Sequence, residues 1–373
     1  MRPVRSRATG PVARGCTAHL VPLPQAGTQL HSHWQQLAES AVEPIPFHEP
    51  AFVLAAARHL EGGATVRLLF ATDGHSMIFA LPVRARPGYR HVPLPVLTTW
   101  RHDYCFLAGP LLRGGMAEHA WAAVLDLALT SWHWLILEDI AAEGTGWDGL
   151  QAALRSRGVV PTERGRHERA VARRRDQPTY LDGRVRGVHL KGFRRQRQLL
   201  GADVRLRVRT GDAGAVEDFL DLEASGWKGR AGGAMAVRPG HAQLLREIVR
   251  DAPGMCEVFS LEAGGSPAAM QVNLRSGSVS YCFKTAYDES RQRQSPGLLL
   301  MLDVLRCFHD DSSLAILDSC AVAGHPMAER LLPDRRPLVT LLVPTSGYGR
   351  AVTRGMSATV RVKSFVSHTR EPS

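Results

Sequence analysis

A carboxylate, a thiol and an imidazole lie close together in the segment ILDSCAVAGHP, residues 316–326. An apolar run ends at Asp318, and Cys320 and His325 follow it in a turn that contains a glycine. Polar groups at the carboxyl end of a strand commonly face a ligand site, and a carboxylate or an imidazole there can act as a general base. We therefore predict that Asp318 or His325 accepts a proton. Cys320 is either a nucleophile paired with His325 or a packing residue.

The segment RQRQSPG, residues 291–297, lies between a strand-like run and a long apolar helix. Ser295 is a favoured N-cap residue, and Pro296 is a favoured first helical residue. The first turn of a helix presents unpaired N–H groups and partial positive charge, which stabilise a phosphate. The pattern indicates an anion site, although a well-capped helix beside a solvated basic turn has the same sequence features. The candidate residues of this site are Arg291, Gln292, Arg293, Gln294, Ser295, Pro296 and Gly297.

The segment WKGRAGGAM, residues 227–235, follows a predicted helix that breaks at Gly226. A glycine-rich loop between two helices can line a ligand site or cover it, and it can equally be a connector with one buried tryptophan. We include Trp227, Lys228 and Arg230 as candidate substrate-binding residues. Asp288, which precedes the anion-binding segment, is a fourth.

Arginine is concentrated between residues 164 and 197, and this stretch leads into VRGVHLKGFRRQRQLLG. Leu190, Phe193 and Leu200 share one helical stripe, whereas Arg194 and Arg195 fall outside it. The pattern predicts a surface helix with a basic outer face, which suits an acidic carrier protein or an RNA backbone and is also common on solvated helices. Aromatic residues are not interleaved with the basic ones, so base-specific RNA recognition is the less favoured interpretation.

The composition limits the class of protein. A chain of 373 residues exceeds the ~250–300 at which a single core stops growing, so two domains are expected. The six cysteines are scattered without a C-x-x-C pair, so we expect neither disulfides nor a metal site. No apolar run approaches the ~18 residues of a membrane span and no signal-like segment occurs, which predicts a cytoplasmic protein. The net charge of +11 favours anionic partners or reflects a general richness in arginine. Walker, G-x-S-x-G and H-E-x-x-H motifs are absent from the sequence.

The remaining sequence predicts helices and strands in a similar order in both halves. The first half contains a helix (51–60), a hairpin (65–71 and 76–83), an extended segment (92–112), a helix (116–131), a strand (134–138) and a helix (147–157). The second contains a strand (204–208), two helices (213–227 and 241–249), three strands (256–262, 268–274 and 279–285), a helix from 296, a strand (314–318), a helix (327–332) and a strand (338–343). We expect an α+β (mixed α/β) fold with a flexible basic tail (1–28), an N-terminal module (29–165), a basic connector and helix (166–201), a C-terminal catalytic module (202–345) and a C-terminal tail (346–373).

Three segments together resemble one family. YCFKTAYDESRQRQSPGLLL (281–300), WKGRAGGAM and LDSCAVAGHP are similar to GNAT-fold acyltransferases of the cellulose-biosynthesis-associated (CelD-like) type, which are distantly similar to Fem-type aminoacyl-tRNA-dependent ligases. The resemblance extends over roughly residues 30–345 and is strongest from 191 to 343. It implies two tandem GNAT-like modules, each a mixed, mostly antiparallel sheet flanked by helices. It also implies transfer of an acyl group, most simply acetyl, to a primary amine.

The resemblance implies a donor site as well. Gln292, Ser295 and Gly297 align with a loop whose backbone amides cradle the pyrophosphate of coenzyme A. Ser295 replaces the first glycine of that loop, and Pro296 removes one N–H donor. An acyl-phosphopantetheine arm on an acidic acyl carrier protein is therefore an alternative to acyl-CoA (acetyl-CoA). An aminoacyl-tRNA donor, as the less favoured partner, and a non-catalytic scaffold remain further alternatives.

In the implied reaction the amine of a small-molecule acceptor attacks a thioester directly, without a covalent enzyme intermediate. The runs 279–285 and 314–318 resemble the two strands that separate to admit the pantetheine arm. This arrangement predicts Tyr281, Lys284, Asp318 and His325 around the reacting carbonyl. Asp318 is our choice of base, with Cys320 beside it. In the first half, the aromatic loop around Trp100, Asp103 and Tyr104 is equally well explained by packing.

Overall fold

The computed structural model describes residues 15–89, 92–175 and 188–355, and the strands in these ranges join into one sheet of thirteen. The elements of the N-terminal half are β1 (Thr17–Pro22), α1 (Thr28–Glu39), α2 (Pro50–His59), β2 (Val66–Thr72), β3 (Met77–Arg86), β4 (Val96–Thr99), β5 (Leu111–Leu112), α3 (Ala117–Ser131), β6 (Trp134–Ala141), α4 (Gly144–Ser156) and β7 (Thr162–Arg173).

The elements of the C-terminal half are α6 (Val188–Leu200), β8 (Arg205–Thr210), α7 (Ala213–Ser225), α8 (Trp227–Arg230), α9 (His241–Asp251), β9 (Cys256–Ala263), β10 (Ser266–Ser276), β11 (Val279–Tyr287), the 3-10 helix η6 (Glu289–Gln294), α10 (Pro296–Asp310), β12 (Ile316–Asp318), α11 (Pro326–Leu331) and β13 (Asp334–Pro344). All strands except β5, which pairs with β3, follow the order β1-β2-β3-β4-β6-β13-β7-β12-β11-β10-β9-β8. Both parallel and antiparallel pairs occur.

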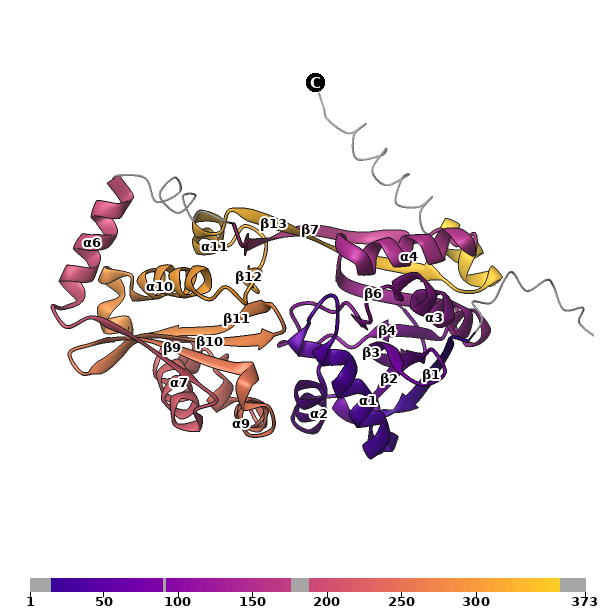
Figure 1. Cartoon of the computed structure of the whole chain (residues 1–373), viewed down its shortest axis with the longest axis horizontal. Helices are drawn as coiled ribbons and strands as arrows, with labels where there is room; N and C mark the ends of the chain where they lie inside the picture. The colour runs from indigo at the N-terminus through magenta and orange to yellow at the C-terminus, as the bar shows by residue number, and fades with distance from the viewer. Residues whose placement is uncertain (1–14, 90–91, 176–187, 356–373) are drawn as a thin grey trace, which may run out of the picture.

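Each half of the sheet is covered by helices on both faces (Figure 1). On β2, Leu68 and Phe70 belong to the core cluster that includes α1 and α2, whereas the alternate residues Leu69 and Ala71 belong to the cluster under α3 and α4. A strand that is buried on both faces reads as a continuous apolar run, which explains the sequence VRLLFAT. In the C-terminal half, α7 and α9 cover one face and α10 covers the other.

The two halves share one hydrophobic core at their boundary. Phe52 from the N-terminal half and Phe219 and Phe283 from the C-terminal half lie in the same buried cluster. The rings of Phe52 and Phe283 are 6.3 Å apart in an edge-to-face arrangement. Aromatic contacts of this kind add to the free energy gained from burial. Because side chains of both halves fill this cluster, the halves are packed against each other as one body.

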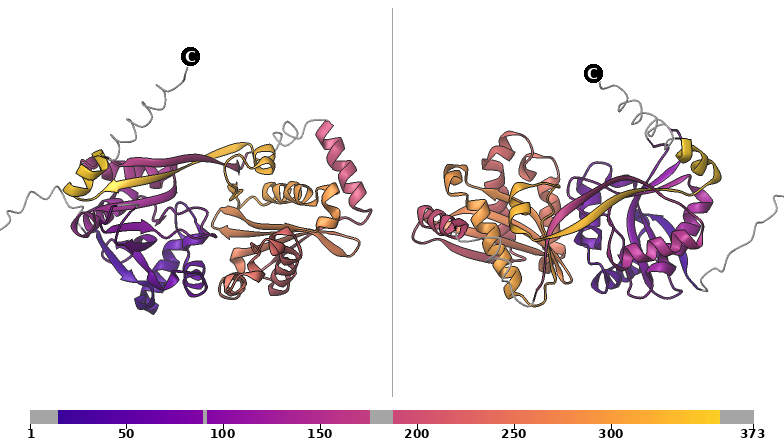
Figure 2. Two further views of the ribbon diagram at one scale, coloured as in Figure 1. Left: turned by 180° about the vertical axis from the view of Figure 1, so that it is seen from behind. Right: turned by 90° about the horizontal axis from the view of Figure 1, so that it is seen from above.

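A long two-stranded ribbon connects the halves. Strands β7 and β13 pair antiparallel from Thr162–Leu342 to Val171–Asp334. The C-terminal part of β13 also pairs with β6, and the C-terminal part of β7 also pairs with β12. Figure 1 shows this ribbon along the upper edge of the molecule, and both views of Figure 2 show it passing from one half to the other. Each half thus supplies a strand that covers a sheet edge of the other.

The ribbon corrects the predicted domain boundaries. The expected end of the N-terminal module, between residues 165 and 166, falls inside β7. The expected connector 166–201 therefore begins as a paired strand, and β13 lies between β6 and β7 rather than within the C-terminal module alone. The first tail also proves shorter, because residues 17–22 form β1 and pair with β2. In the expected C-terminal tail, residues 347–355 are helical.

Most predicted helices and strands are confirmed, as is the mixed α/β fold class. The hairpin of β2 and β3 turns at Asp73 and Gly74, where Asp73 Oδ1 accepts a hydrogen bond from the Ser76 N–H at 3.0 Å. The basic helix is α6, and its Phe193 and Leu200 pack against the cluster around α10, whereas Leu190 falls outside the described side chains. Within the described ranges, no helix has the length and apolar character needed to cross a membrane.

Candidate functional site

The parallel strand pairs of the two halves separate in the same way. In the C-terminal half, β11 and β12 pair only from Val279–Ile316 to Tyr281–Asp318, after which β11 continues without β12. In the N-terminal half, β4 and β6 pair only from Val96–Trp134 to Thr98–Ile136. Each separation leaves backbone groups at a sheet interior without a strand partner, and such positions are available to a ligand. The expected separation of the runs 279–285 and 314–318 is thus present in the structure.

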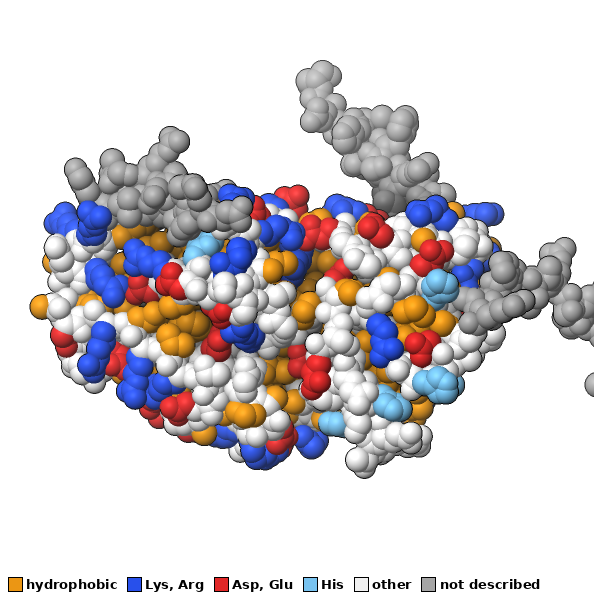
Figure 3. Space-filling view, in the orientation of Figure 1, with side chains coloured by type: hydrophobic (Ala, Val, Ile, Leu, Met, Phe, Trp, Pro, Cys, Tyr) orange, Lys and Arg blue, Asp and Glu red, His pale blue; other side chains and the backbone are white. Residues whose placement is uncertain are grey.

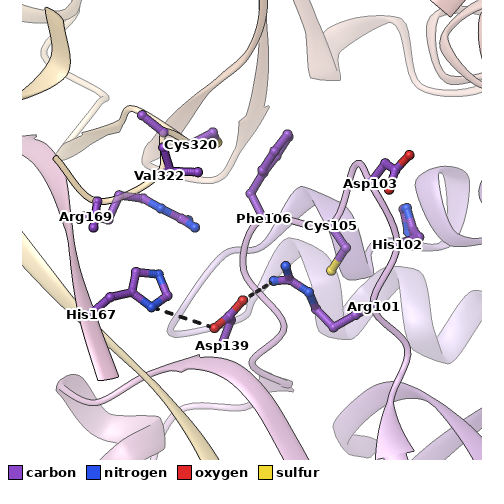
Figure 4. Close-up of a pocket in the computed structure, with 12 residues that line it drawn as sticks. Arg101, His102, Asp103, Cys105, Phe106, Asp139, His167, Arg169, Cys320 and Val322 are labelled. Atoms are coloured by element: carbon purple, nitrogen blue, oxygen red, sulfur yellow. Dashed lines mark ion pairs between the residues drawn. The ribbon is translucent and has the colours of Figure 1, made fainter. Parts of the chain in front are cut away.

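A pocket of about 730 Å³ lies where the N-terminal separation faces the C-terminal half, and we call it the interface pocket (Figure 4). Residues 101–103, 105 and 106 after β4 form one wall, and Asp139 on β6 lies at its base. His167 and Arg169 point into it from one face of β7, and residues 320–323 after β12 close the opposite side. The chain that follows the β11–β12 separation therefore also lines this pocket. Its volume is typical of a small-molecule site.

Two residues of the interface pocket have unusual backbone conformations. Asp139 has φ 44° and Cys320 has φ 52°, and Ser295 with φ 51° is the other non-glycine residue with positive φ in the described ranges. Asp139 lies at an irregularity in the pairing of β6 with β13, where Thr340, between Val339 and Leu341, lies opposite two residues of β6. A bulge of this type redirects a side chain, and positive φ in residues other than glycine concentrates at functional sites.

The pocket contains charges of both signs. Arg101 Nη1 lies 2.7 Å from Asp139 Oδ2, and His167 Nδ1 lies 3.9 Å from Asp139 Oδ1 (Figure 4). The Arg169 side chain is 5% exposed, and its Nη1 lies 3.7 Å from an oxygen of Asp318. These groups surround the space in which a polar ligand would lie.

Two further pocket residues are neutral at physiological pH. Burial lowers the pKa of His102 to about 3, with smaller contributions from His48 and Arg101. Burial also raises the pKa of Cys105 to about 12, so this thiol does not ionise. The Cys105 sulfur lies 3.8 Å from His48 Nε2, but burial lowers the pKa of that imidazole to about 4 as well. A thiolate–imidazolium pair is therefore not formed here.

Asp318, the predicted base, is held in a buried ion pair. Its side chain is fully buried, and its Oδ2 accepts a hydrogen bond from Arg336 Nη1 at 2.8 Å. Its Oδ1 accepts one from the Cys320 N–H at 2.9 Å. Since each carboxylate oxygen already has a partner, the structure assigns Asp318 to fixing the end of β12. This corrects the prediction of a free proton acceptor, because the sequence did not show that Arg336 is paired with it.

His325 and Cys320 also have local roles. His325 is the N-cap of α11, and its Nδ1 accepts from the Ala328 N–H at 3.4 Å. The Cys320 thiol is buried, which raises its pKa well above the usual value, with Asp318 as a second cause. A buried neutral thiol is a poor nucleophile. Of the two interpretations of Cys320, packing fits the structure.

Tyr281 and Lys284 lie at the boundary between the halves. The Tyr281 hydroxyl donates to the Pro44 carbonyl oxygen at 2.7 Å, and burial raises its pKa above the usual value. Lys284 Nζ donates to Glu223 Oε1 at 3.3 Å and lies 5.1 Å from the centre of the Tyr104 ring. Both side chains therefore help to hold the halves together beside the separated strands.

The RQRQSPG segment forms the end of η6 and the start of α10. The helix start at Pro296 was predicted, but most donors in the segment have partners. Arg291 donates to the Ala263 carbonyl oxygen and to Ser266 Oγ, both at 2.8 Å, so its charge fixes the β9–β10 turn. Ser295 is the N-cap of α10, yet its side chain makes no capping hydrogen bond because the residue is in the left-handed region. Gln292 and Arg293 are exposed, whereas Gln294 is partly buried.

Few backbone donors remain at the start of α10. The N–H groups of Ser295, Leu298 and Leu299 each donate to a carbonyl oxygen within this segment, and Pro296 has none. In the described structure, Gly297 keeps the one N–H in this stretch without an acceptor. Pyrophosphate bound here would be held by that N–H and by Arg293, which is fewer contacts than a glycine-rich loop offers.

The WKGRAGGAM segment packs beside η6 rather than forming an open lid. Lys228 Nζ donates to the Thr285 carbonyl oxygen at 2.6 Å and lies 3.6 Å from Glu223, and burial lowers its pKa. Arg230 and the Trp227 N–H both donate to Glu289. The Trp227 ring is exposed, contrary to the buried tryptophan of the connector interpretation. Asp288 caps η6 by accepting from the Ser290 N–H at 2.9 Å.

Comparison with known proteins agrees with this geometry. Residues 187–321 match the family model described as acetyltransferase (GNAT) domain. This match concerns less than half of the chain. This matched domain includes both separating strands β11 and β12, the η6–α10 segment and the loop up to residue 321. A comparison with curated protein sequences finds no match.

Solved structures share the fold across most of the chain. FemX superimposes with a TM-score of 0.58 at 10% sequence identity, covering 84% of this chain and 95% of FemX. The C-terminal domain of a putative lysylphosphatidylglycerol synthetase from Agrobacterium fabrum gives 0.55 at 11% identity, covering 88% of this chain and 95% of that domain. A conserved protein of unknown function from Bacteroides thetaiotaomicron gives a TM-score of 0.55 at 13% identity, covering 84% of this chain and 97% of that protein. At these identities the likeness concerns the fold.

Sequence reasoning missed the polar residues of the interface pocket. Arg101, Asp139, His167 and Arg169 were not selected, because none of them belongs to a motif with a known spacing. One signal was available: His167 and Arg169 are two residues apart in TERGRHERAVAR, so they share a face if that segment is a strand. The many charges in the segment hid this strand.

Proposed function

We propose that this chain is an N-acyltransferase in which a thioester lies along the separated strands β11 and β12 and a primary amine lies in the interface pocket. The observation that supports this most strongly is the continuity of the two places. The β11–β12 pair separates at Tyr281 and Asp318 inside the GNAT-type domain, and the chain after Asp318 forms one side of the pocket at Cys320 to Ala323. An acyl carbon at the separation and an amine in the pocket are thereby brought near the same loop.

The proposed reaction is a direct transfer. The amine nitrogen attacks the thioester carbonyl carbon, the C–S bond breaks, and the released thiolate takes up a proton. The amine proton passes to a base, and His167, which points into the pocket beside the Asp139 carboxylate and is partly open to solvent, is the group in position to accept it. This assignment replaces Asp318 as our choice of base. Holding both reactants in one cleft supplies much of the rate gain in such transfers.

The donor is proposed to carry a phosphopantetheine thioester, either as acyl-CoA or on a carrier protein. Gly297 N–H and the exposed Arg293 support a bound phosphate at η6 and α10. Because Arg291 is already bonded to the β9–β10 turn, the pyrophosphate of free coenzyme A gains few contacts. An acidic carrier protein would instead use the exposed Arg194 and Arg195 of α6, which packs against η6.

The same basic helix supports a second candidate, transfer of an aminoacyl group from a charged tRNA. Lys and Arg side chains are frequent at the end of the molecule where α6 lies (Figure 3). An RNA backbone would bind there with strong salt dependence. In this case the reacting bond is an ester rather than a thioester, and the acceptor pocket is the same.

A calorimetric titration of nucleic-acid-free protein with acetyl-CoA tests the proposal first. We expect binding that weakens in Arg293→Ala and is unchanged in Arg250→Ala, which changes an exposed arginine on α9. If acetyl-CoA does not bind, the acyl carrier protein and the aminoacyl-tRNA are titrated next. Thiol release with a panel of amines then follows turnover. Failure of all three donors to bind would contradict an acyltransferase function.

A further inference from the structure

The guanidinium of Arg169 is buried and incompletely paired. The residue is 5% exposed, and its Nε and Nη1 make no hydrogen bond in the described structure. Figure 4 shows this side chain extending from β7 into the interface pocket, between His167 and Phe106. Buried polar groups in proteins are nearly always hydrogen-bonded, and an arginine presents its donors as a planar fork. A buried arginine that lines a cavity while two of its donors are unused therefore marks the place of a missing acceptor.

Asp318 does not satisfy these donors. Its Oδ1 is 3.7 Å from Arg169 Nη1, which is beyond hydrogen-bond distance, and already accepts from the Cys320 N–H. Its Oδ2 accepts from Arg336, which is also buried. Two buried arginines thus share one buried carboxylate. A second anion at Arg169 would balance the charge and accept from one of the unused donors.

The other charged groups of the pocket leave room for that anion. The Asp139 carboxylate is paired with Arg101 at 2.7 Å, so its charge is compensated within the pocket. Arg101 and Arg169 approach the same space from the loop after β4 and from β7 (Figure 4). A carboxylate or phosphate can accept the fork of an arginine with two oxygens at once. A pocket of about 730 Å³ accommodates such a group together with the rest of a small molecule.

We infer that the interface pocket binds a small acceptor through an anionic group, a carboxylate or a phosphate, which is held by the fork of Arg169 with Arg101 beside it. This inference rests on the proposed function only in calling the bound molecule an acceptor, because the anion site exists whether or not transfer occurs there. The substrate class is then an amino acid, a short peptide with a free amine and a free carboxylate, or an amine that carries a phosphate.

Matched pairs of amines test the anion directly. β-Alanine is compared with β-alaninamide for the carboxylate, and phosphoethanolamine with ethanolamine for the phosphate. Binding of each to the full-length protein is measured by ligand-observed NMR at constant ionic strength. We expect the anionic member of at least one pair to bind about tenfold more tightly or better, because a charge-assisted hydrogen bond to arginine is among the stronger polar contacts. The pair that shows the preference identifies the group.

Variants of one strand locate the site. Arg169→Met should abolish the preference, whereas Arg166→Met, on the same strand but outside the pocket, should leave it intact. If Arg169→Met does not fold, as judged by circular dichroism, Arg169→Lys serves instead and should reduce the preference because lysine has no fork. Equal binding of the members of both pairs, or an unchanged preference in these variants, would overturn the inference. Anion binding without thiol release would count against the proposed function alone, and thiol release with amines of either kind would count against the inference alone.

Discussion

Replacing Asp318 by asparagine separates a structural from a catalytic role for this residue. The fully buried carboxylate faces Arg336 at 2.8 Å and Arg169 at 3.7 Å, and both arginines are buried. Removing one partner of a buried ion pair typically costs 3–5 kcal/mol, because the remaining charge is left uncompensated. Asparagine has a single acceptor oxygen, so it keeps the bond from the Cys320 N–H or the bond from Arg336 and turns an N–H donor toward the other; we therefore expect a loss of about 3–5 kcal/mol.

Equilibrium unfolding in urea, followed by circular dichroism, measures this loss. The matched control is Asp126→Asn, which breaks an ion pair with Arg157 that is largely at the surface and should cost less than about 1 kcal/mol. Asp318→Asn combined with Arg336→Gln should recover part of the loss, since it removes the uncompensated charge. A single variant Asp318→Asn that unfolds at the wild-type urea concentration yet has lost turnover would refute this reasoning and restore Asp318 as a base.

Three further predictions concern single side chains. Burial raises the pKa of Glu49 to about 7, so the contribution of this carboxyl group to stability is complete below about pH 4.5 and is lost as the pH rises through 7. Glu49→Gln should therefore be more stable than the wild type at pH 8, by an amount on the order of 2–3 kcal/mol. At about pH 4.5 the two proteins should have nearly equal urea midpoints. Cys320 of the wild type should resist iodoacetamide and Cys320→Ala should retain turnover, because the thiol is buried and neutral; an acyl adduct on Cys320 in mass spectra would contradict this. Tyr281→Phe leaves the Pro44 carbonyl oxygen without its donor and should lower the free energy of unfolding by about 1–2 kcal/mol, and an unchanged midpoint would show that this contact does not hold the halves together.

The predictability of the fold depended on how local its signals were. Helix α10 was predicted from a proline at its first position followed by an apolar run, and the β2–β3 hairpin from Asp73 and Gly74 between apolar segments. Strand β7 was missed because its first half, TERGRHER, is charged and partly exposed. That half is a strand because β13 pairs with it, and β13 comes from the other end of the chain.

The candidate site was predictable in position but not in chemistry. The separation after Tyr281 and Asp318 was expected from the resemblance of these segments to GNAT-type proteins and is present. The role of Asp318 was not, because Arg169 and Arg336 lie on two other strands. A carboxylate with two buried cationic neighbours is an ion-pair partner, whereas the same carboxylate in an open cleft can be a base.

The sequence by itself determined the mixed α/β class and most helices and strands, because these features depend on residues close together in the chain. Only the tertiary structure decided that β7 and β13 exchange between the halves and that Arg101, Asp139, His167 and Arg169 meet in one pocket. These facts depend on pairing between distant strands, and a charge acquires its function from the groups that folding brings near it.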